Sequence, residues 1–284
     1  MKLKIAVQKS GRLYDDSLKI LKECGIELPA ALNKLLNEAI NFPLQILFLR
    51  DDDIPQYVED GVADIGIVGE NVIFEKGRNI QLLDKLGFGK CRLSIAIPRN
   101  ESYTGVDFLH QKRIATSYPF LLQQFLDEQK VEAEIHEISG AVEITTSVGL
   151  ADAICDLVSS GSTLFSNGLK EAEVVLNSEA ALISNKDLDD EKQLLVKKLL
   201  FRIQAVKKSR KYKYILLNVP NDKIETICSI IPGMKSPSII PLTTEGWSSL
   251  HSVVHEDDFW NIIESLKEHG AQGILVAPIE KMIV

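Results

Sequence analysis

The sequence predicts an α/β protein with two sheet-containing lobes and a smaller C-terminal domain. Short apolar strand candidates alternate with amphipathic helical segments up to about residue 206. A basic run at 207–211 then precedes a segment whose elements follow the order βαββαβ. Alternation of strands and helices is typical of a parallel sheet covered by helices, and βαββαβ is the ferredoxin-like order. A chain of 284 residues is long enough for such a division.

The first lobe is predicted over residues 1–92, and a return segment at 181–206 completes it. Its strands are expected at 3–8, 44–49 and 65–68, and its helices at 17–23, at 54–60 and after Gly69. The second lobe is predicted over 93–180, with strands at 91–98, 113–116, 134–138, 152–158 and 174–176 and a helix at 119–129. The C-terminal domain is predicted over 207–284. Two lobes of this kind form a cleft, where ligands bind.

Composition excludes several classes of protein. A net charge of −8 and a pI near 5.3 argue against a nucleic-acid partner, because such proteins neutralise phosphates with basic patches. No apolar run reaches the length of a membrane helix, and the N-terminus does not resemble a signal peptide. The four cysteines are widely spaced and form no CxxC pair, as expected of free thiols in a reducing compartment. We therefore expect a cytoplasmic protein without a membrane partner.

The stretch 152–164, DAICDLVSSGSTL, predicts a cradle for a phosphorylated sugar. A strand carrying Asp152 and Asp156 leads into a turn of small residues, which lets a phosphate approach the backbone amides. Carboxylates just upstream suit the hydroxyls of a ribose. The turn residues are Ser159, Ser160, Gly161, Ser162 and Thr163. The alternative is an ordinary strand, turn and capped helix, and the stretch alone does not decide between the two.

Cationic and small residues follow other predicted strands at the edge where ligands bind. Lys9, Gly11 and Arg12 follow the first strand, which indicates contacts with anionic phosphates or a solvated turn, and Arg50 follows the second strand as a candidate contact for a phosphate or a base. The acids at 51–53 could bind a metal ion, but they are better explained as helix-capping residues, with Asp53 as the N-cap.

Three further candidate residues lie at or just after the ends of predicted strands. Gly69 allows close approach of a ligand, although this signal is weak. Thr116 and Tyr118 lie just before a helix and form a second candidate anion site, or a capped helix start without a ligand.

Together these segments resemble the long form of the ATP phosphoribosyltransferase family over essentially the whole chain. The matching motifs are QKSGRL at 8–13, LRDDDIPQYVEDGVADIGIVGEN at 49–71, CRLSIAIP at 91–98, RIATSYP at 113–119, GAVE at 140–143, GLADAICDLVSSGSTLFSNGL at 149–169, IPGMKSPSIIPL at 231–242 and HGAQGILVAPIEKM at 269–282. The resemblance implies a two-lobed, periplasmic-binding-protein-like catalytic core and a ferredoxin-like regulatory domain. It also implies transfer of a phosphoribosyl group from phosphoribosyl pyrophosphate to N1 of ATP, with release of pyrophosphate.

The resemblance also implies roles for the residues singled out above. The loop 159–163 would hold the 5-phosphate, and Asp152 or Asp156 with Glu143 would face the ribose. Lys9, Arg12 and Arg50 would neutralise pyrophosphate or ATP phosphates. ATP contacts are expected from Gly11, Arg50, Gly69, Thr116 and Tyr118. Mg²⁺ would be held mainly by substrate oxygens, with Asp156 as a candidate protein ligand.

In the C-terminal domain the resemblance implies a site for histidine as a feedback inhibitor. The expected residues are Asn218, Met234, Ser236, Ser238 and Gly273. Asn218 stands where some members of the family carry an acid that could pair with the amino or imidazole group of the ligand. The family also implies dimers that assemble into hexamers. Two other classes fit parts of the pattern, namely a two-lobed solute-binding protein and a non-catalytic regulatory subunit that senses amino acids.

Overall fold

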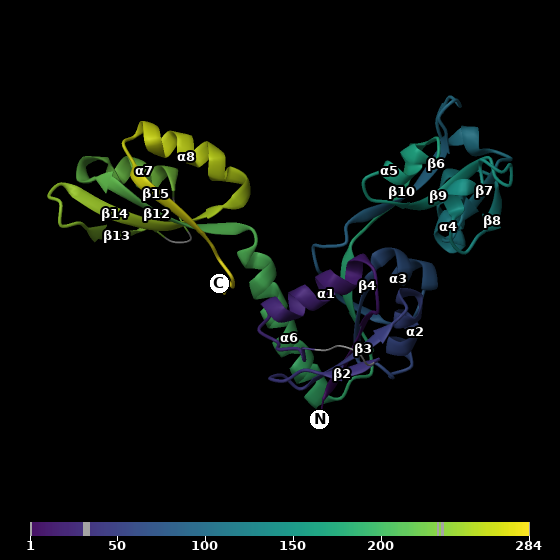
Figure 1. The fold of residues 1–284 in the computed structure, drawn as a ribbon, viewed down its shortest axis with the longest axis horizontal. Coiled ribbons are helices and arrows are strands. Elements are labelled where there is room, and N and C mark those ends of the chain that lie inside the picture. The colour runs from purple at the N-terminus through teal and green to yellow at the C-terminus, as the bar shows by residue number, and fades with distance from the viewer. Residues whose placement is uncertain (1, 31–34, 232, 234–235, 284) are drawn as a thin grey trace. The chain divides into compact units, whose positions relative to one another are not determined.

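The structure, a computed structural model, describes residues 2–30, 35–231, 233 and 236–283, with the backbone alone at Arg12. The chain divides into two compact units, Met1–Val196 and Lys197–Val284, each considered by itself. Figure 1 shows two sheets in the first unit and one in the second. None of the helices in the described part of the chain is long and apolar enough to cross a membrane.

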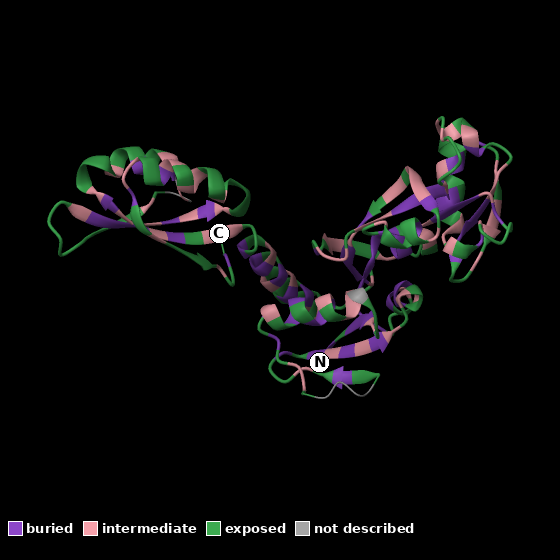
Figure 2. Cartoon of the chain, turned by 45° about the horizontal axis from the view of Figure 1, so that its top comes forward, coloured by how far each residue is buried: buried purple, intermediate pink, exposed green. Residues whose placement is uncertain are grey.

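The first sheet has six strands in the order β2-β3-β1-β4-β11-β5. They are β1 (Leu3–Gln8), β2 (Leu36–Glu38), β3 (Leu44–Leu49), β4 (Ile65–Gly69), β5 (Gln81–Lys85) and β11 (Ala180–Ser184). β1 is parallel to β3 and β4, whereas β2, β5 and β11 pair antiparallel with their neighbours. Every residue of β4 and β11 is buried, which explains their continuous apolar sequences (Figure 2).

Three helices connect the strands of the first sheet: α1 (Arg12–Glu23), α2 (Ile54–Glu59) and α3 (Glu70–Lys76). A 3₁₀ turn, η1 (Asp51–Asp53), precedes α2. Asp53 occupies the N-cap position of α2 as predicted, but its side chain makes no capping hydrogen bond. The N-cap position of Asp53 is therefore confirmed, but the capping hydrogen bond expected of its side chain is absent.

The second sheet has five strands in the order β10-β6-β9-β7-β8. They are β6 (Cys91–Pro98), β7 (Arg113–Thr116), β8 (Glu134–Glu137), β9 (Ala153–Val158) and β10 (Leu169–Ser178). Its helical elements are η2 (Val106–Leu109), α4 (Pro119–Gln129), η3 (Val142–Ile144) and α5 (Ser162–Ser166). β7 is parallel to β8 and β9, but β6 is antiparallel to both β9 and β10. Both sheets of this unit are thus mixed, which corrects the expectation of a parallel sheet.

The chain passes between these two sheets twice. The first passage joins β5 to β6, and the second, through Glu179, joins β10 to β11. The ends of strands from both sheets are therefore brought to one region of the first unit.

The second unit follows the predicted order, with β12 (Tyr212–Pro220), α7 (Ile224–Ile230), β13 (Ser238–Pro241), β14 (Trp247–His255), α8 (Phe259–Glu268) and β15 (Gln272–Pro278). Short 3₁₀ turns, η4 (Asn221–Lys223) and η5 (Glu256–Asp258), precede its helices, and α6 (Asp190–Ser209) leads into β12. The antiparallel sheet has the order β13-β14-β12-β15, with α7 and α8 on one face (Figure 1). This confirms the ferredoxin-like prediction.

Candidate functional site

One cavity of about 370 Å³ lies where the ends of the two sheets of the first unit meet. Residues from both sheets and from the passages between them line it: Gln8, Leu13, Asp51, Gly69, Asn71, Val72, Gly89, Lys90, Cys91, Glu143, Asp156, Leu157, Val158, Ser159, Ser160, Gly161, Ser162, Thr163 and Leu164. The predicted loop at 159–163 therefore lies in the cavity throughout its length.

The loop owes its shape to the end of β9. The strand ends at Val158, whose side chain is buried, and the chain turns at Gly161, where φ is 79°. This left-handed conformation favours glycine over any residue with a side chain. α5 begins directly afterwards at Ser162, and the hydroxyls of Ser160 and Ser162 lie 3.0 Å apart. The loop thus presents two neighbouring hydroxyls beside backbone amides.

Three carboxylates line the same cavity: Asp51, Asp156 and Glu143. Burial raises the pKa of Asp156, and the nearby charge of Glu143 raises it further. The pKa of Asp51 is also raised, first by burial and then by the neighbouring charge of Asp52. Burial and the repulsion of a neighbouring acid make the ionised forms of Asp51 and Asp156 costly. A cation or a hydroxyl-rich ligand entering the cavity would stabilise those ionised forms.

Of the cationic residues predicted for the site, Lys9 and Arg50 do not line the cavity. Lys9 and Arg50 follow the adjacent strands β1 and β3, where the Lys9 amide donates to the Leu49 carbonyl at 2.8 Å. Both side chains are exposed, and the lining residues Gln8 and Asp51 directly adjoin them in sequence. Gly11 is exposed at the N-cap of α1 with φ of 95°. Arg12 begins α1, but its side chain lies outside the described parts.

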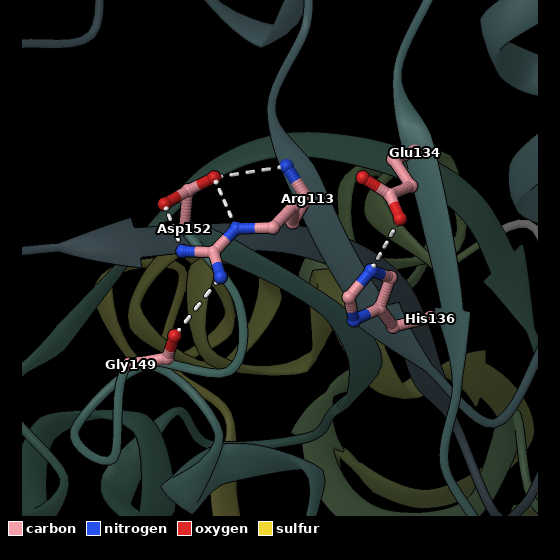
Figure 3. Close-up of polar contacts among 5 residues, drawn as sticks. All are labelled: Arg113, Glu134, His136, Gly149 and Asp152. Carbon is pink, nitrogen blue, oxygen red and sulfur yellow. Dashed lines mark hydrogen bonds and ion pairs between the residues drawn. The ribbon is translucent and has the colours of Figure 1, made fainter.

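Asp152 does not line the cavity. It precedes β9, whereas Asp156 and the loop lie toward the other end of that strand. Its carboxylate accepts from Arg113 at 2.8 Å from Nη2, at 3.2 Å from Nε and at 3.0 Å from the backbone amide (Figure 3). The same guanidinium donates to the Gly149 carbonyl at 3.0 Å. These bonds lower the pKa of Asp152 to about 2. The structure therefore separates the two aspartates that the sequence left as alternatives.

Thr116 and Tyr118 are placed near the cavity but outside its lining. Thr116 is fully buried, and its hydroxyl donates to the Cys155 carbonyl at 2.7 Å and accepts from the Tyr118 amide at 2.9 Å. That hydroxyl is engaged within the fold. Burial raises the pKa of Tyr118, and the charge of Asp156 adds to the effect. The phenol accepts a hydrogen bond at 3.1 Å from the side-chain amide of Asn71, a lining residue, so it adjoins the cavity wall.

Asn71 connects the cavity to both sheets and was not predicted from the sequence. Its side-chain amide donates to the hydroxyl of Tyr118 at 3.1 Å, and its carbonyl oxygen accepts from the Ser178 hydroxyl at 2.9 Å. Close by, the carboxylate of Glu75 accepts from the amides of Phe120 and Leu121 at 3.0 Å each, at the start of α4. α3 and α4 are thus joined by hydrogen bonds.

The glycine at position 69 is required by Asn71. A Cβ atom at Gly69 would lie 2.3 Å from the side-chain oxygen of Asn71, which is far inside contact distance. Gly69 is therefore part of the cavity wall for a steric reason. Asp51, Asn71 and Lys90 are lining residues that the sequence reasoning missed. Only the position of Asp51, after a predicted strand, gave a signal.

In the second unit, two of the residues predicted for histidine lie together. The side-chain nitrogen of Asn218 on β12 is 3.1 Å from the point where a Cβ at Gly273 would lie. Ser238 begins β13 opposite His251, and Asn218 lies opposite Ser249 on the intervening strand β14. Ser236 is exposed, and Met234 lies outside the described residues.

Comparison with known proteins assigns the family. The family described as ATP phosphoribosyltransferase matches residues 50–205, and its C-terminal domain matches residues 209–281. An ATP phosphoribosyltransferase of Cytophaga hutchinsonii is 58% identical over 281 residues, covering 99% of this chain and 98% of that protein. That of Bacteroides thetaiotaomicron is 54% identical, covering 99% and 100%. The chain belongs to the ATP phosphoribosyltransferase family. It is thus a pentosyltransferase of the first step of histidine biosynthesis.

Solved structures agree with this assignment. An ATP phosphoribosyltransferase (HisG:HisZ) complex from Thermotoga maritima is 26% identical with a TM-score of 0.60, covering 71% of this chain and 98% of that chain. The substrate-binding protein of an amino acid ABC transporter is 13% identical with a TM-score of 0.50, covering 74% and 94%. The second likeness shows the fold alone. The family core is accordingly periplasmic-binding-protein-like, as predicted, and the solute-binding alternative is excluded by the family.

Proposed function

We propose that the cavity transfers the 5-phosphoribosyl group of phosphoribosyl pyrophosphate to N1 of the adenine ring of ATP. The observation that carries this proposal is the joint placement of Asp156, Glu143 and the loop 159–163 in one cavity. In the reaction, the lone pair of N1 forms a bond to the anomeric carbon. The bond from that carbon to oxygen breaks, and its electrons leave with pyrophosphate.

Each part of the cavity has a distinct task in this proposal. The hydroxyls and amides of Ser159, Ser160, Gly161, Ser162 and Thr163 hold the 5-phosphate. Asp156 and Glu143 accept from the ribose hydroxyls and stabilise the positive charge that develops on the sugar. Asp152 was an equal candidate for the ribose, but its bonds to Arg113 favour Asp156. Catalysis then consists mainly of positioning and electrostatic stabilisation.

The first sheet supplies the nucleotide side. Lys9, Arg12 and Arg50 neutralise pyrophosphate or the phosphates of ATP. Gly11, Gly69, Thr116 and Tyr118 complete the ATP site, with Thr116 acting through its bond to the Tyr118 amide rather than through a free hydroxyl. Lys9 and Arg50 are exposed and adjoin the lining residues Gln8 and Asp51 in sequence, which supports contact with phosphates that extend from the cavity into solvent.

Mg²⁺ belongs to the proposal as the counter-ion of the pyrophosphate. No group of three His, Cys, Asp or Glu side chains placed to hold a metal ion was found among the described residues. The donor set nevertheless suits this ion, because Asp51 and Asp156 offer carboxylate oxygens whose burial favours a neutralising cation. These carboxylates would share Mg²⁺ with substrate oxygens, and the bound ion supplies charge neutralisation of the leaving group.

Histidine is proposed as a feedback inhibitor at Asn218, Met234, Ser236, Ser238 and Gly273. The proximity of the Asn218 side-chain amide to Gly273 supports a common site at which both contact the amino acid. We also propose that the enzyme acts in the cytoplasm as a homo-oligomer, in a dimer and hexamer equilibrium. Exposure of β15, an edge strand in which only Ile274 is half-buried, supports association.

The test is incubation of the protein with ATP, phosphoribosyl pyrophosphate and Mg²⁺, with and without histidine. The expected products are pyrophosphate and N1-phosphoribosyl-ATP, identified by mass and by the NMR signals of the modified adenine. Histidine should lower the rate. A folded protein that forms no product would overturn the assignment of the cavity. Gly161→Trp should block the loop and abolish turnover while histidine binding persists.

A further inference from the structure

The loop proposed to bind the 5-phosphate is held from outside the cavity by an arginine that is not part of the cavity wall. Arg92 on β6 lies opposite Val158 in the antiparallel pairing with β9, immediately before the loop begins. Its Nη1 donates to the backbone carbonyl of Ser159 at 3.3 Å. The bond therefore acts on the first peptide group of the loop, between Ser159 and Ser160.

The guanidinium of Arg92 is itself fixed in position. Its Nε and Nη2 donate to the two carboxylate oxygens of Glu171 on β10. Ser94, which is fully buried, donates its hydroxyl to the same carboxylate at 2.7 Å. The network thus connects β9, β6 and β10, with Ser94 directly opposite Asp156. A bidentate arginine–carboxylate pair defines orientation as well as position.

The geometry of a trans peptide links this network to the cavity. The carbonyl oxygen and the amide hydrogen of one peptide group point in opposite directions, and no described peptide bond is cis. When Arg92 binds the carbonyl of Ser159, the amide of Ser160 must therefore point away from Arg92. Within the described chain, that amide has no hydrogen-bond acceptor.

We infer that Arg92 and Glu171 are positioning residues that hold the amide of Ser160 toward the 5-phosphate of the donor. The inference rests on the proposed function of the loop. Since Glu171 balances the charge of Arg92, the effect is one of geometry rather than of added positive potential. The pKa of Glu171 is lowered by Arg92, which keeps the carboxylate ionised and the pair intact.

A second arginine constrains the far end of the same segment. Arg99 donates from Nη2 to the Phe165 carbonyl at 2.6 Å and from Nε to the Leu169 carbonyl at 3.3 Å. Its guanidinium also lies over the ring of Phe165, 3.4 Å from the centroid. The segment between Ser159 and Phe165 is therefore anchored at both ends, so a change at Arg92 is expected to act locally on the first peptide.

The test uses ribose 5-phosphate, which carries the 5-phosphate without pyrophosphate. In the wild type, this probe should shift the ¹⁵N–¹H signal of Ser160. Arg92→Gln should weaken binding of ribose 5-phosphate and of phosphoribosyl pyrophosphate by about tenfold, the cost of a misplaced hydrogen bond. The KM for ATP should stay within about twofold. Glu171→Gln, which keeps the arginine but loosens its orientation, should act in the same direction with a smaller effect.

The control is Arg78→Gln, which removes a surface arginine paired with Glu59 at 3.5 Å. It should leave the affinities for ribose 5-phosphate and phosphoribosyl pyrophosphate and the KM for ATP unchanged. Thermal unfolding reports whether each variant folds. If Arg92→Gln does not fold, Ser94→Ala is the milder change, because it removes only the Ser94 hydrogen bond to Glu171. If Arg92→Gln weakened binding of ATP and of phosphoribosyl pyrophosphate equally, or left binding of phosphoribosyl pyrophosphate unchanged, the positioning role would be overturned. The proposed function of the loop would not be affected by that result. Absence of any shift at 159–163 in the wild type would instead overturn the proposed phosphate loop, and the inference with it.

Discussion

Asn71 donates its side-chain amide to the hydroxyl of Tyr118 at 3.1 Å, which joins α3, beside the first sheet, to the segment that leads into α4, beside the second. Asn71 is 5% exposed and lines the cavity, so this bond is made at the place where the ligand is proposed to bind. The same side chain accepts from Ser178, which ends β10. One buried amide therefore links three segments that are distant in sequence.

Tyr118→Phe should lower stability because it leaves the buried Asn71 amide without its acceptor. The expected cost is about 1–2 kcal/mol. Asn71→Ala removes the bonds to both Tyr118 and Ser178 and should cost more. Chemical denaturation of the two variants checks the order. Equal stability of Tyr118→Phe and the wild type would show that the amide finds another acceptor.

Gly69→Ala should disrupt the cavity wall because its Cβ would lie 2.3 Å from the side-chain oxygen of Asn71. We expect a loss of about 1–3 kcal/mol in stability and a large fall in kcat/KM, since Asn71 must leave its position. The double variant with Asn71→Ala removes the clash. A double-mutant cycle should therefore show strong coupling, and purely additive losses would contradict the steric explanation.

Asp156→Asn should stabilise the ligand-free protein while abolishing turnover. The pKa of Asp156 is raised by burial and by Glu143, so ionising this carboxyl costs more in the folded state than in the unfolded state. A raised folded pKa means that this carboxylate reduces stability as pH rises through that pKa. The gain of the variant should therefore be seen at pH 7 and should disappear in acid, below the ordinary pKa of aspartate. A Tm series over pH checks this, and an unchanged Tm at pH 7 would refute it.

Asp152→Asn should act on stability rather than on the cavity. The pKa of Asp152 is lowered to about 2 by its bonds to Arg113. A carboxyl whose pKa is lowered by folding stabilises the folded state at every pH above its pKa in the unfolded chain. That contribution is lost as pH falls from about 4 to about 2. Because the side chain is 35% exposed, solvent screening reduces the cost of the variant to about 1 kcal/mol at pH 7.

Urea unfolding at pH 7 and at pH 2.5 measures the difference between Asp152→Asn and the wild type, which should shrink in acid. Donor KM provides the second measurement for this variant. An increase in donor KM without loss of stability would favour ribose contact by Asp152 over the structural role.

The sequence predicted most elements of both lobes because apolar strands and amphipathic helices carry strong periodic signals. It missed β2 and β5, which are short or largely exposed and whose pattern differs little from that of a loop. It also predicted parallel sheets, because local patterns do not report how a distant strand such as β11 is oriented.

For the site, the sequence located the loop 159–163 but did not separate Asp152 from Asp156. The deciding fact is that Arg113, on the neighbouring strand β7, binds Asp152, and this pairing spans 39 residues. Asn71 was missed for a similar reason, since both of its partners lie far along the chain. Asp51 was assigned to helix capping, which is the commoner use of an acid at that position.

The placement of β11 between β4 and β5 affects the order in which the two sheets can fold during translation. Among the strands of the described residues, β5 pairs with β11 alone, and residues 180–184 are synthesised only after β5. The five strands of the second sheet all precede that point. During translation the second sheet can therefore form before the first is complete. Until β11 is synthesised, the edge of β4 that pairs with β11 stays unpaired. A nascent chain halted before residue 180 would expose that edge to aggregation, and completion of β11 removes the hazard.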